Sequence, residues 1–86
     1  MNLVIDIGNT KVKAAVFELD TIKVAYVFDE IYFFNQLEDI LEKHEITHCI
    51  LSSVKETRED YIQKLKKIPF FIVLDSSTKV PFKNLF

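Results

Sequence analysis

The sequence predicts an α/β domain with one mixed sheet flanked by helices and with its elements in the order βββαβαβ. Near-continuous apolar runs at residues 2–7, 47–54 and 70–74 are typical of parallel strands that are covered on both faces. The segments between the later runs carry apolar residues at helical spacing. Short turns separate the first three strands, as in an antiparallel meander. Together these three observations predict a sheet in which the runs at 2–7, 47–54 and 70–74 are parallel and central.

The first three strands are predicted at residues 2–7, 11–19 and 22–28. The first is apolar almost throughout, whereas the other two alternate between apolar and polar positions. Gly8, Asn9 and Thr10 interrupt the first pair of strands, and Asp20 with Thr21 interrupts the second. Residues of these types predict tight turns at both places. Asp29 and Glu30, after the third strand, are interpreted as solvated turn residues.

A change of hydrophobic period predicts two helices. Apolar residues from Phe33 to His44 form one helical stripe, with charged residues opposite. Thr57 and Asp60 resemble a capping box at the start of the second helix. Pro69 ends that helix, because the residue before a proline is pushed out of the helical region. The inward-facing residues of the second helix are predicted to be Tyr61, Ile62, Leu65 and Ile68, and the aromatic core candidates are Phe33, Phe34, Phe70 and Phe71.

Composition is that of one small globular domain and excludes several classes of protein. Of the 86 residues, 49% are hydrophobic and 28% are charged. Cys49 is the single cysteine, so an internal disulfide is excluded, and with His44 and His48 it makes no zinc site. A formal charge of −2 argues against a nucleic-acid partner. No apolar run approaches the roughly 20 residues of a membrane span and no signal peptide is recognisable, so we expect a cytoplasmic protein without a membrane partner.

The stretch from Asp6 to Lys11 carries the residues most suggestive of chemistry. Gly8 is the only glycine, and glycine permits a sharp turn, a positive φ or the close approach of a ligand. Asn9, Thr10 and Lys11 offer amide, hydroxyl and ammonium donors to a phosphate. Asp6, a carboxylate in a buried strand, needs a cation, several donors or an exposed strand end, and a divalent ion bound to phosphates would supply the cation. The same residues are also typical of a plain β-hairpin, and both interpretations remain open because a hairpin can carry a phosphate loop.

Further polar residues end the predicted parallel strands. Functional groups on such a sheet gather beyond the carboxyl ends of its parallel strands. Asp6 lies at the end of the first run, Ser52 and Ser53 end the run at 47–54, and Asp75 follows the last run. We therefore expect these side chains to converge at one edge of the sheet.

Three motifs resemble segments of the type III pantothenate kinases, a family of the acetate and sugar kinase, Hsp70 and actin superfamily. Residues 3–11 (Leu-Val-Ile-Asp-Ile-Gly-Asn-Thr-Lys) are similar to the N-terminal signature of that family. Residues 49–54 resemble its strand ending in Ser-Ser-Val, and residues 78–86 resemble its Thr-x-x-Pro-x-x-Asn-x-Tyr stretch. The resemblance implies a ribonuclease H-like βββαβαβ core, the first half of an actin-like ATPase domain. Residues 1–86 would then form a single domain, the N-terminal portion of a two-domain kinase.

The resemblance also implies a function and a site. It implies an ATP-dependent kinase for pantothenate, acting in the first step of coenzyme A biosynthesis. Gly8, Asn9, Thr10 and Lys11 would contact the ATP phosphates, and Asp6 would hold the metal ion. The implied cofactors are ATP, Mg²⁺ and a monovalent cation such as K⁺ or NH₄⁺. The implied partners are ATP and pantothenate, together with a second copy of the chain in a homodimer.

Two further residues are candidates for lining the cleft, namely Ser53 and Phe86. Phe86 stands where the family has a tyrosine, so a hydroxyl is missing there. The family's catalytic base lies in a Gly-x-Asp-Arg motif expected beyond Phe86, so we assign no catalytic residue within this chain and expect the chain alone to be inactive. The alternative is a non-catalytic ribonuclease H-like module that binds a partner or self-associates, which the apolar residues among 80–86 suggest.

Overall fold

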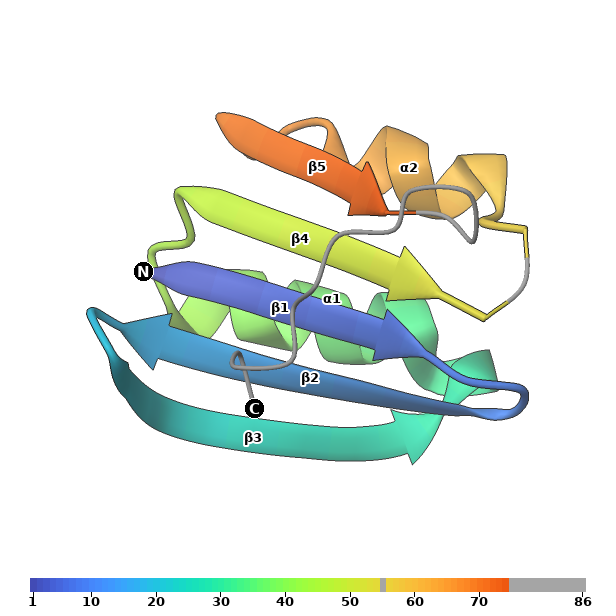
Figure 1. Cartoon of the computed structure of the whole chain (residues 1–86), viewed down its shortest axis with the longest axis horizontal. Helices are drawn as coiled ribbons and strands as arrows, with labels where there is room; N and C mark the ends of the chain where they lie inside the picture. The colour runs from blue at the N-terminus through green and yellow to red at the C-terminus, as the bar shows by residue number, and fades with distance from the viewer. Residues whose placement is uncertain (55, 75–86) are drawn as a thin grey trace.

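The computed structural model describes residues 1–54 and 56–74, and the predicted order of strands and helices is confirmed (Figure 1). One short 3₁₀ helix, η1, is present in addition to the predicted elements. The elements in chain order are β1 (Asn2–Ile7), β2 (Lys11–Glu18), β3 (Thr21–Asp29), η1 (Glu30–Tyr32), α1 (Phe33–Lys43), β4 (His48–Ser53), α2 (Glu59–Leu65) and β5 (Phe70–Leu74). Asp75 and Phe86 lie outside the described residues.

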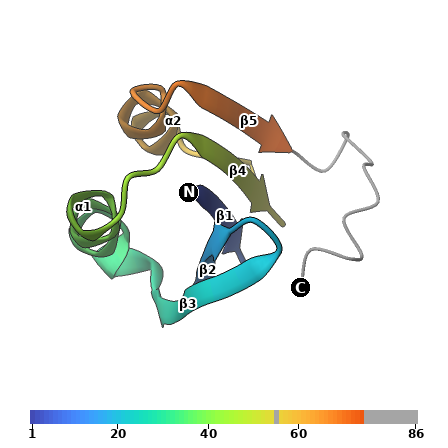
Figure 2. The same ribbon diagram turned by 90° about the vertical axis from the view of Figure 1, so that its left-hand side faces the viewer.

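The five strands form one mixed sheet in the order β3-β2-β1-β4-β5. β1 pairs antiparallel with β2 and parallel with β4, and β4 pairs parallel with β5. Figure 2 shows α1 and α2 side by side on one face of this sheet. Right-handed crossovers explain that placement, because both connections advance across the sheet in the same direction and therefore pass over the same face.

The core lies between the two helices and the sheet face that they cover. Alternate residues of β1, β2 and β4 point into it, as the period of a strand requires. Phe33 of α1 and Tyr61 of α2 are each 1% exposed, and their rings stack at 3.8 Å between centroids. The buried cluster consists of Leu3, Ile5, Ile7, Val12, Ala14, Val16, Phe33, Leu37, Ile40, Cys49, Leu51, Tyr61, Leu65 and Ile68.

The sequence predicted that β5 would be buried on both faces, and this prediction is wrong. Phe70 and Ile72 are 61% and 56% exposed, so Phe70 is not a core residue. Both lie on the face of the sheet opposite the core, since Ile72 pairs through Ile50 with Val4, whereas Phe71 packs against the core cluster. β5 is an edge strand rather than a central one, and neither described helix covers this second face (Figure 2).

The predicted capping box of the second helix is also wrong. The residue that precedes α2 is Arg58. Among the described residues, Arg58 makes no side-chain cap hydrogen bond and the buried Oγ1 of Thr57 has no hydrogen-bond partner. Asp60 instead accepts hydrogen bonds from the Arg58 guanidinium and from the backbone N–H of Tyr61. The box fails because the helix begins one residue later than its spacing requires. Within the described ranges, no helix has the length and apolar character needed to cross a bilayer.

Cys49 lies in β4 with 1% of its surface exposed, as expected of a small apolar core residue. Burial raises the pKa of its thiol from 9.0 to about 12. Between these two pKa values the folded state keeps the thiol proton that the unfolded chain has lost. The stabilisation that the buried thiol contributes is therefore complete below pH 9 and is lost as the pH rises toward 12.

We expect alkaline destabilisation that depends on Cys49. The free energy of unfolding, measured with urea, should fall by about 1 kcal/mol per pH unit above the ordinary thiol pKa. A Cys49→Ala variant should show a shallower fall, even though its stability at neutral pH is lower. Equal slopes for the two proteins would contradict the assignment.

Candidate functional site

The turn between β1 and β2 is closed by its only glycine. The Gly8 N–H donates to the carbonyl of Lys11 at 2.8 Å, so Asn9 and Thr10 form the tip. The φ of Gly8 is not positive, and across the described residues only Leu19 has a positive φ, of 56°. A Cβ at position 8 would lie 3.2 Å from the Lys11 carbonyl oxygen. Limited space beside the Lys11 carbonyl, rather than left-handed backbone geometry, therefore favours glycine at this position.

Residues at the end of β3 hold this turn in place. The Thr10 carbonyl accepts a hydrogen bond from the Glu30 N–H at 3.0 Å. The Lys11 Nζ lies 2.5 Å from Asp29 Oδ1, and these two side chains are 62% and 49% exposed. An exposed ion pair contributes at most about 1 kcal/mol, so the Lys11 ammonium can leave Asp29 at little cost.

Asp6 lies half-buried in β1 and points away from the helices. Its cross-strand partners are Lys13 of β2 and Ser52 of β4, and the Ser52 hydroxyl donates to Asp6 Oδ1 at 3.1 Å. Ser53 pairs with Ile7 instead and therefore lies on the core face, where it is 8% exposed. The register thus brings Ser52, and not Ser53, to the side of Asp6.

The six residues around the turn line one open pocket of about 230 Å³ at the carboxyl end of β1. They include all of the predicted phosphate residues and the predicted metal residue, and they are Asp6, Gly8, Asn9, Thr10, Lys11 and Lys13. One carboxylate, one hydroxyl and two ammonium groups suit a metal ion bound to phosphates, because Mg²⁺ is usually held by one or two carboxylates together with phosphate oxygens. In the described part of the chain, no cluster of three His, Cys, Asp or Glu side chains competes as a metal site.

Two features of the site were not predicted. Lys13 was unremarkable in the sequence, because its position opposite Asp6 depends on the pairing of β1 with β2. Glu30 is half-buried rather than solvated: its backbone N–H binds Thr10, and its carboxylate accepts a hydrogen bond from Tyr61. Its neighbours Asp29 and Arg58 join Asn9 and Thr10 in a second pocket of about 490 Å³ behind the turn.

A larger pocket, of about 640 Å³, lies at the opposite end of the sheet. Asn2, Phe17, His48 and Phe70 contribute to it, and they belong to a single rung near the amino ends of the parallel strands. The described residues that line it are mainly apolar and form no constellation of catalytic type. Pocket volume alone therefore does not identify the functional site. The polar pocket at the β1–β2 turn, at the carboxyl ends of the parallel strands, is the better candidate.

The fold and the pocket define a two-layer α/β domain with a candidate anion-binding hairpin at the carboxyl edge of its parallel strands. The chain belongs to the type III pantothenate kinase family, whose model matches residues 2–86. It is 37% identical over its whole length to the type III pantothenate kinase of Bacteroides fragilis strain YCH46. It is 41% identical over 98% of its length to that of Christiangramia forsetii. The chain spans 35% of the length of each of these relatives.

Among solved structures, the chain resembles the crystal structure of Archaeoglobus fulgidus Pelota. The TM-score is 0.60 at 15% sequence identity, and the match covers 98% of this chain and 28% of that chain. At that identity the similarity supports the mixed α/β fold alone. The family predicted from the three sequence motifs is thus confirmed by the family model and by the curated relatives.

Proposed function

We propose that the chain is the N-terminal, ATP-phosphate-binding domain of a two-domain kinase that phosphorylates pantothenate with ATP. The observation that carries the proposal is the pocket at the β1–β2 turn, which gathers Asp6 and residues 8–11 of the family signature in one place. We assign the core to the ribonuclease H-like type on the basis of its element order and strand order. The proposal includes Mg²⁺, a monovalent cation, a homodimer and a cytoplasmic location, as the family resemblance implies.

The proposed roles of the residues follow from their chemistry. Phosphoryl transfer depends mainly on positioning and on stabilisation of charge. Lys11 would neutralise phosphate oxygens once it leaves Asp29, and Lys13 would add a second positive charge beside Asp6. Thr10 would donate its hydroxyl to a phosphate. Mg²⁺, when bound, supplies further neutralisation of the phosphates, and the Asp6 carboxylate, oriented by Ser52, would hold it.

The alternative of a non-catalytic module has less support, because every curated relative described above is a kinase and the signature residues line one pocket. We also propose that the chain alone is inactive and binds ATP weakly. It contributes one wall of a phosphate site, and phosphoryl transfer needs both reactants to be held in line. Calorimetric titration of the chain with ATP and Mg²⁺ should show little binding, and tight binding would contradict this point.

The proposed function is tested with the complete coding region. We expect the sequence after Phe86 to contain Gly-x-Asp-Arg within about two dozen residues. We expect the complete protein to form ADP and phosphopantothenate from ATP and pantothenate. A folded complete protein that consumes no ATP in the presence of pantothenate would refute the function, whatever its sequence.

Replacing Gly8 with alanine is expected to impair ATP use far more than stability. The added Cβ would meet the Lys11 carbonyl at 3.2 Å, so the turn must shift by a few tenths of an ångström. Because φ is not positive, this shift should cost only about 1 kcal/mol of unfolding free energy. It moves Asn9 and Thr10, however, and should raise the KM for ATP of the complete kinase by about tenfold, because the proposed phosphate contacts depend on the placement of these two residues. If the loss of unfolding free energy were as large as the loss of ATP binding, Gly8 would have a structural role in the hairpin and no particular role in phosphate binding.

A further inference from the structure

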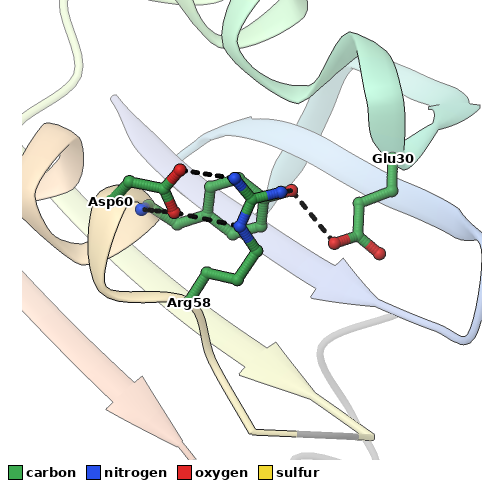
Figure 3. Close-up of polar contacts among 4 residues, drawn as sticks. Glu30, Arg58 and Asp60 are labelled. Atoms are coloured by element: carbon green, nitrogen blue, oxygen red, sulfur yellow. Dashed lines mark hydrogen bonds and ion pairs between the residues drawn. The ribbon is translucent and has the colours of Figure 1, made fainter.

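A cluster of four polar and aromatic side chains lies directly behind the β1–β2 turn (Figure 3). The Tyr61 hydroxyl donates to Glu30 Oε2 at 3.0 Å, and Arg58 Nη1 donates to the same hydroxyl at 3.1 Å. The Tyr61 ring stacks on Phe33 at an angle of 22°. Because the core fixes this ring, it also fixes the position of the hydroxyl.

Arg58 is held on the face of the Tyr61 ring. Its Nε donates to Asp60 Oδ1 at 3.1 Å, and its Nη2 to Asp60 Oδ2 at 2.5 Å. Its guanidinium carbon lies 4.5 Å from the ring centroid, within the range of a cation–π contact. Burial and the hydrogen bond to Glu30 raise the pKa of Tyr61. The hydroxyl therefore remains protonated and able to donate at neutral pH.

Glu30 links this cluster to the turn. Its side chain accepts the Tyr61 hydrogen bond, and its backbone N–H donates to the Thr10 carbonyl at 3.0 Å. The residue before it, Asp29, pairs with Lys11. Two consecutive residues at the end of β3 therefore bind the turn, and one of them is anchored to α2.

We propose that Tyr61 is a positioning residue for the phosphate-binding turn, acting through Glu30. The inference deepens the proposed function, on which its kinetic part rests. Tyr61 belongs to α2 and to the core, so it ties the geometry of the turn to the helix layer on the far side of the sheet. Loss of the hydroxyl removes one hydrogen bond from the Glu30 carboxylate, so the backbone N–H that binds the Thr10 carbonyl is held less firmly.

The first experiment uses the chain itself and needs no nucleotide. Tyr61→Phe removes one hydroxyl and keeps the stacked ring. Hydrogen exchange at the Glu30 N–H, which binds Thr10, should become about five- to tenfold faster, as expected for the loss of one hydrogen bond. The Phe70 N–H, bonded to the Thr47 carbonyl at the opposite end of the sheet, should be unaffected. Unchanged exchange at Glu30, or equal acceleration at Glu30 and Phe70, would overturn the proposal.

Tyr26→Phe is the matched control. Tyr26 is half-buried in β3, and its hydroxyl also has a side-chain partner, His44 Nε2 at 3.4 Å, but it lies away from the turn. We expect this variant to leave exchange at Glu30 unchanged. Glu30→Gln keeps an acceptor for Tyr61 and should preserve slow exchange, whereas Glu30→Ala should reproduce the effect of Tyr61→Phe. These Glu30 variants also serve if Tyr61→Phe fails to fold.

The second experiment uses the complete kinase. Tyr61→Phe should raise the KM for ATP about five- to tenfold and leave the KM for pantothenate unchanged, while Tyr26→Phe should change neither. Equal increases in both KM values would indicate a general structural effect and overturn the positioning role. If the complete protein has no kinase activity, the proposed function fails, and the exchange experiment alone decides whether Tyr61 orders the turn.

Discussion

Replacing Asp6 with asparagine is expected to lower kcat/KM of the complete kinase by about 10²- to 10³-fold, the usual effect of removing one preorganised electrostatic contact. Of the described residues that line the pocket at the β1–β2 turn, Asp6 is the one with a carboxylate. Asparagine retains an oxygen that accepts the Ser52 hydrogen bond, so the sheet should be undisturbed. What is lost is the negative charge that would hold the metal ion beside the phosphates.

The dependence on Mg²⁺ separates this role from a structural one. The concentration of Mg²⁺ needed for half-maximal activity should rise in Asp6→Asn, and urea unfolding of the variant chain should resemble that of the original. Asp39→Asn is the matched control, because Asp39 is a partly exposed carboxylate on α1, paired with Lys43 and remote from the turn. If Asp39→Asn and Asp6→Asn had the same activity, Asp6 would not be the metal residue.

Replacing Phe33 with alanine is expected to remove most of the stability of the chain. Phe33 is 1% exposed and contacts both Tyr61 and Phe34 with its ring. Truncation of a buried phenylalanine to alanine lowers the free energy of unfolding by about 3–5 kcal/mol. A domain of this size has an unfolding free energy of only about 5 kcal/mol. Urea titration followed by circular dichroism should show a midpoint of unfolding at a much lower urea concentration.

Phe70→Ala provides the same chemical change at an exposed position. Phe70 is 61% exposed and stacks on His48 at the edge of the sheet, so its truncation should cost less than about 1 kcal/mol. Comparable destabilisation by the two substitutions would mean that the face of the sheet carrying Phe70 is as important to stability as the helix-covered core.

Hydrophobic period predicted the order of elements because it records which residues are buried along each element. The strands at Asn2–Ile7 and Phe70–Leu74 have the predicted bounds. Period does not record which face an apolar residue meets, so the continuous run of β5 suggested burial on both faces where one face is exposed. The prediction of a capping box at Thr57 and Asp60 was wrong because the motif considers only these two residues. It does not anticipate that the Arg58 guanidinium donates hydrogen bonds to the Asp60 carboxylate.

The candidate site was predictable where it is contiguous in sequence and unpredictable where it depends on pairing. Asp6 and the residues of the turn are neighbours along the chain, and the structure places them around one pocket. The choice of Ser52 over Ser53 depends on the parallel register of β1 with β4, because a shift of one residue exchanges the faces. The contact of Glu30 with Tyr61 joins residues 31 positions apart, and no local pattern encodes it.

The central place of β1 also determines when the site can form during folding. The hairpin of β1 and β2 is local and can close within microseconds, so the turn itself can appear early. The bond between Ser52 and Asp6 spans 46 residues and needs the parallel pairing of β1 with β4. Such non-local pairing is slow, because the chain loses loop-closure entropy before the contacts that stabilise the pairing can form. The hairpin can therefore close before Asp6 gains its Ser52 partner, so the candidate site is complete only once β1 has paired with β4.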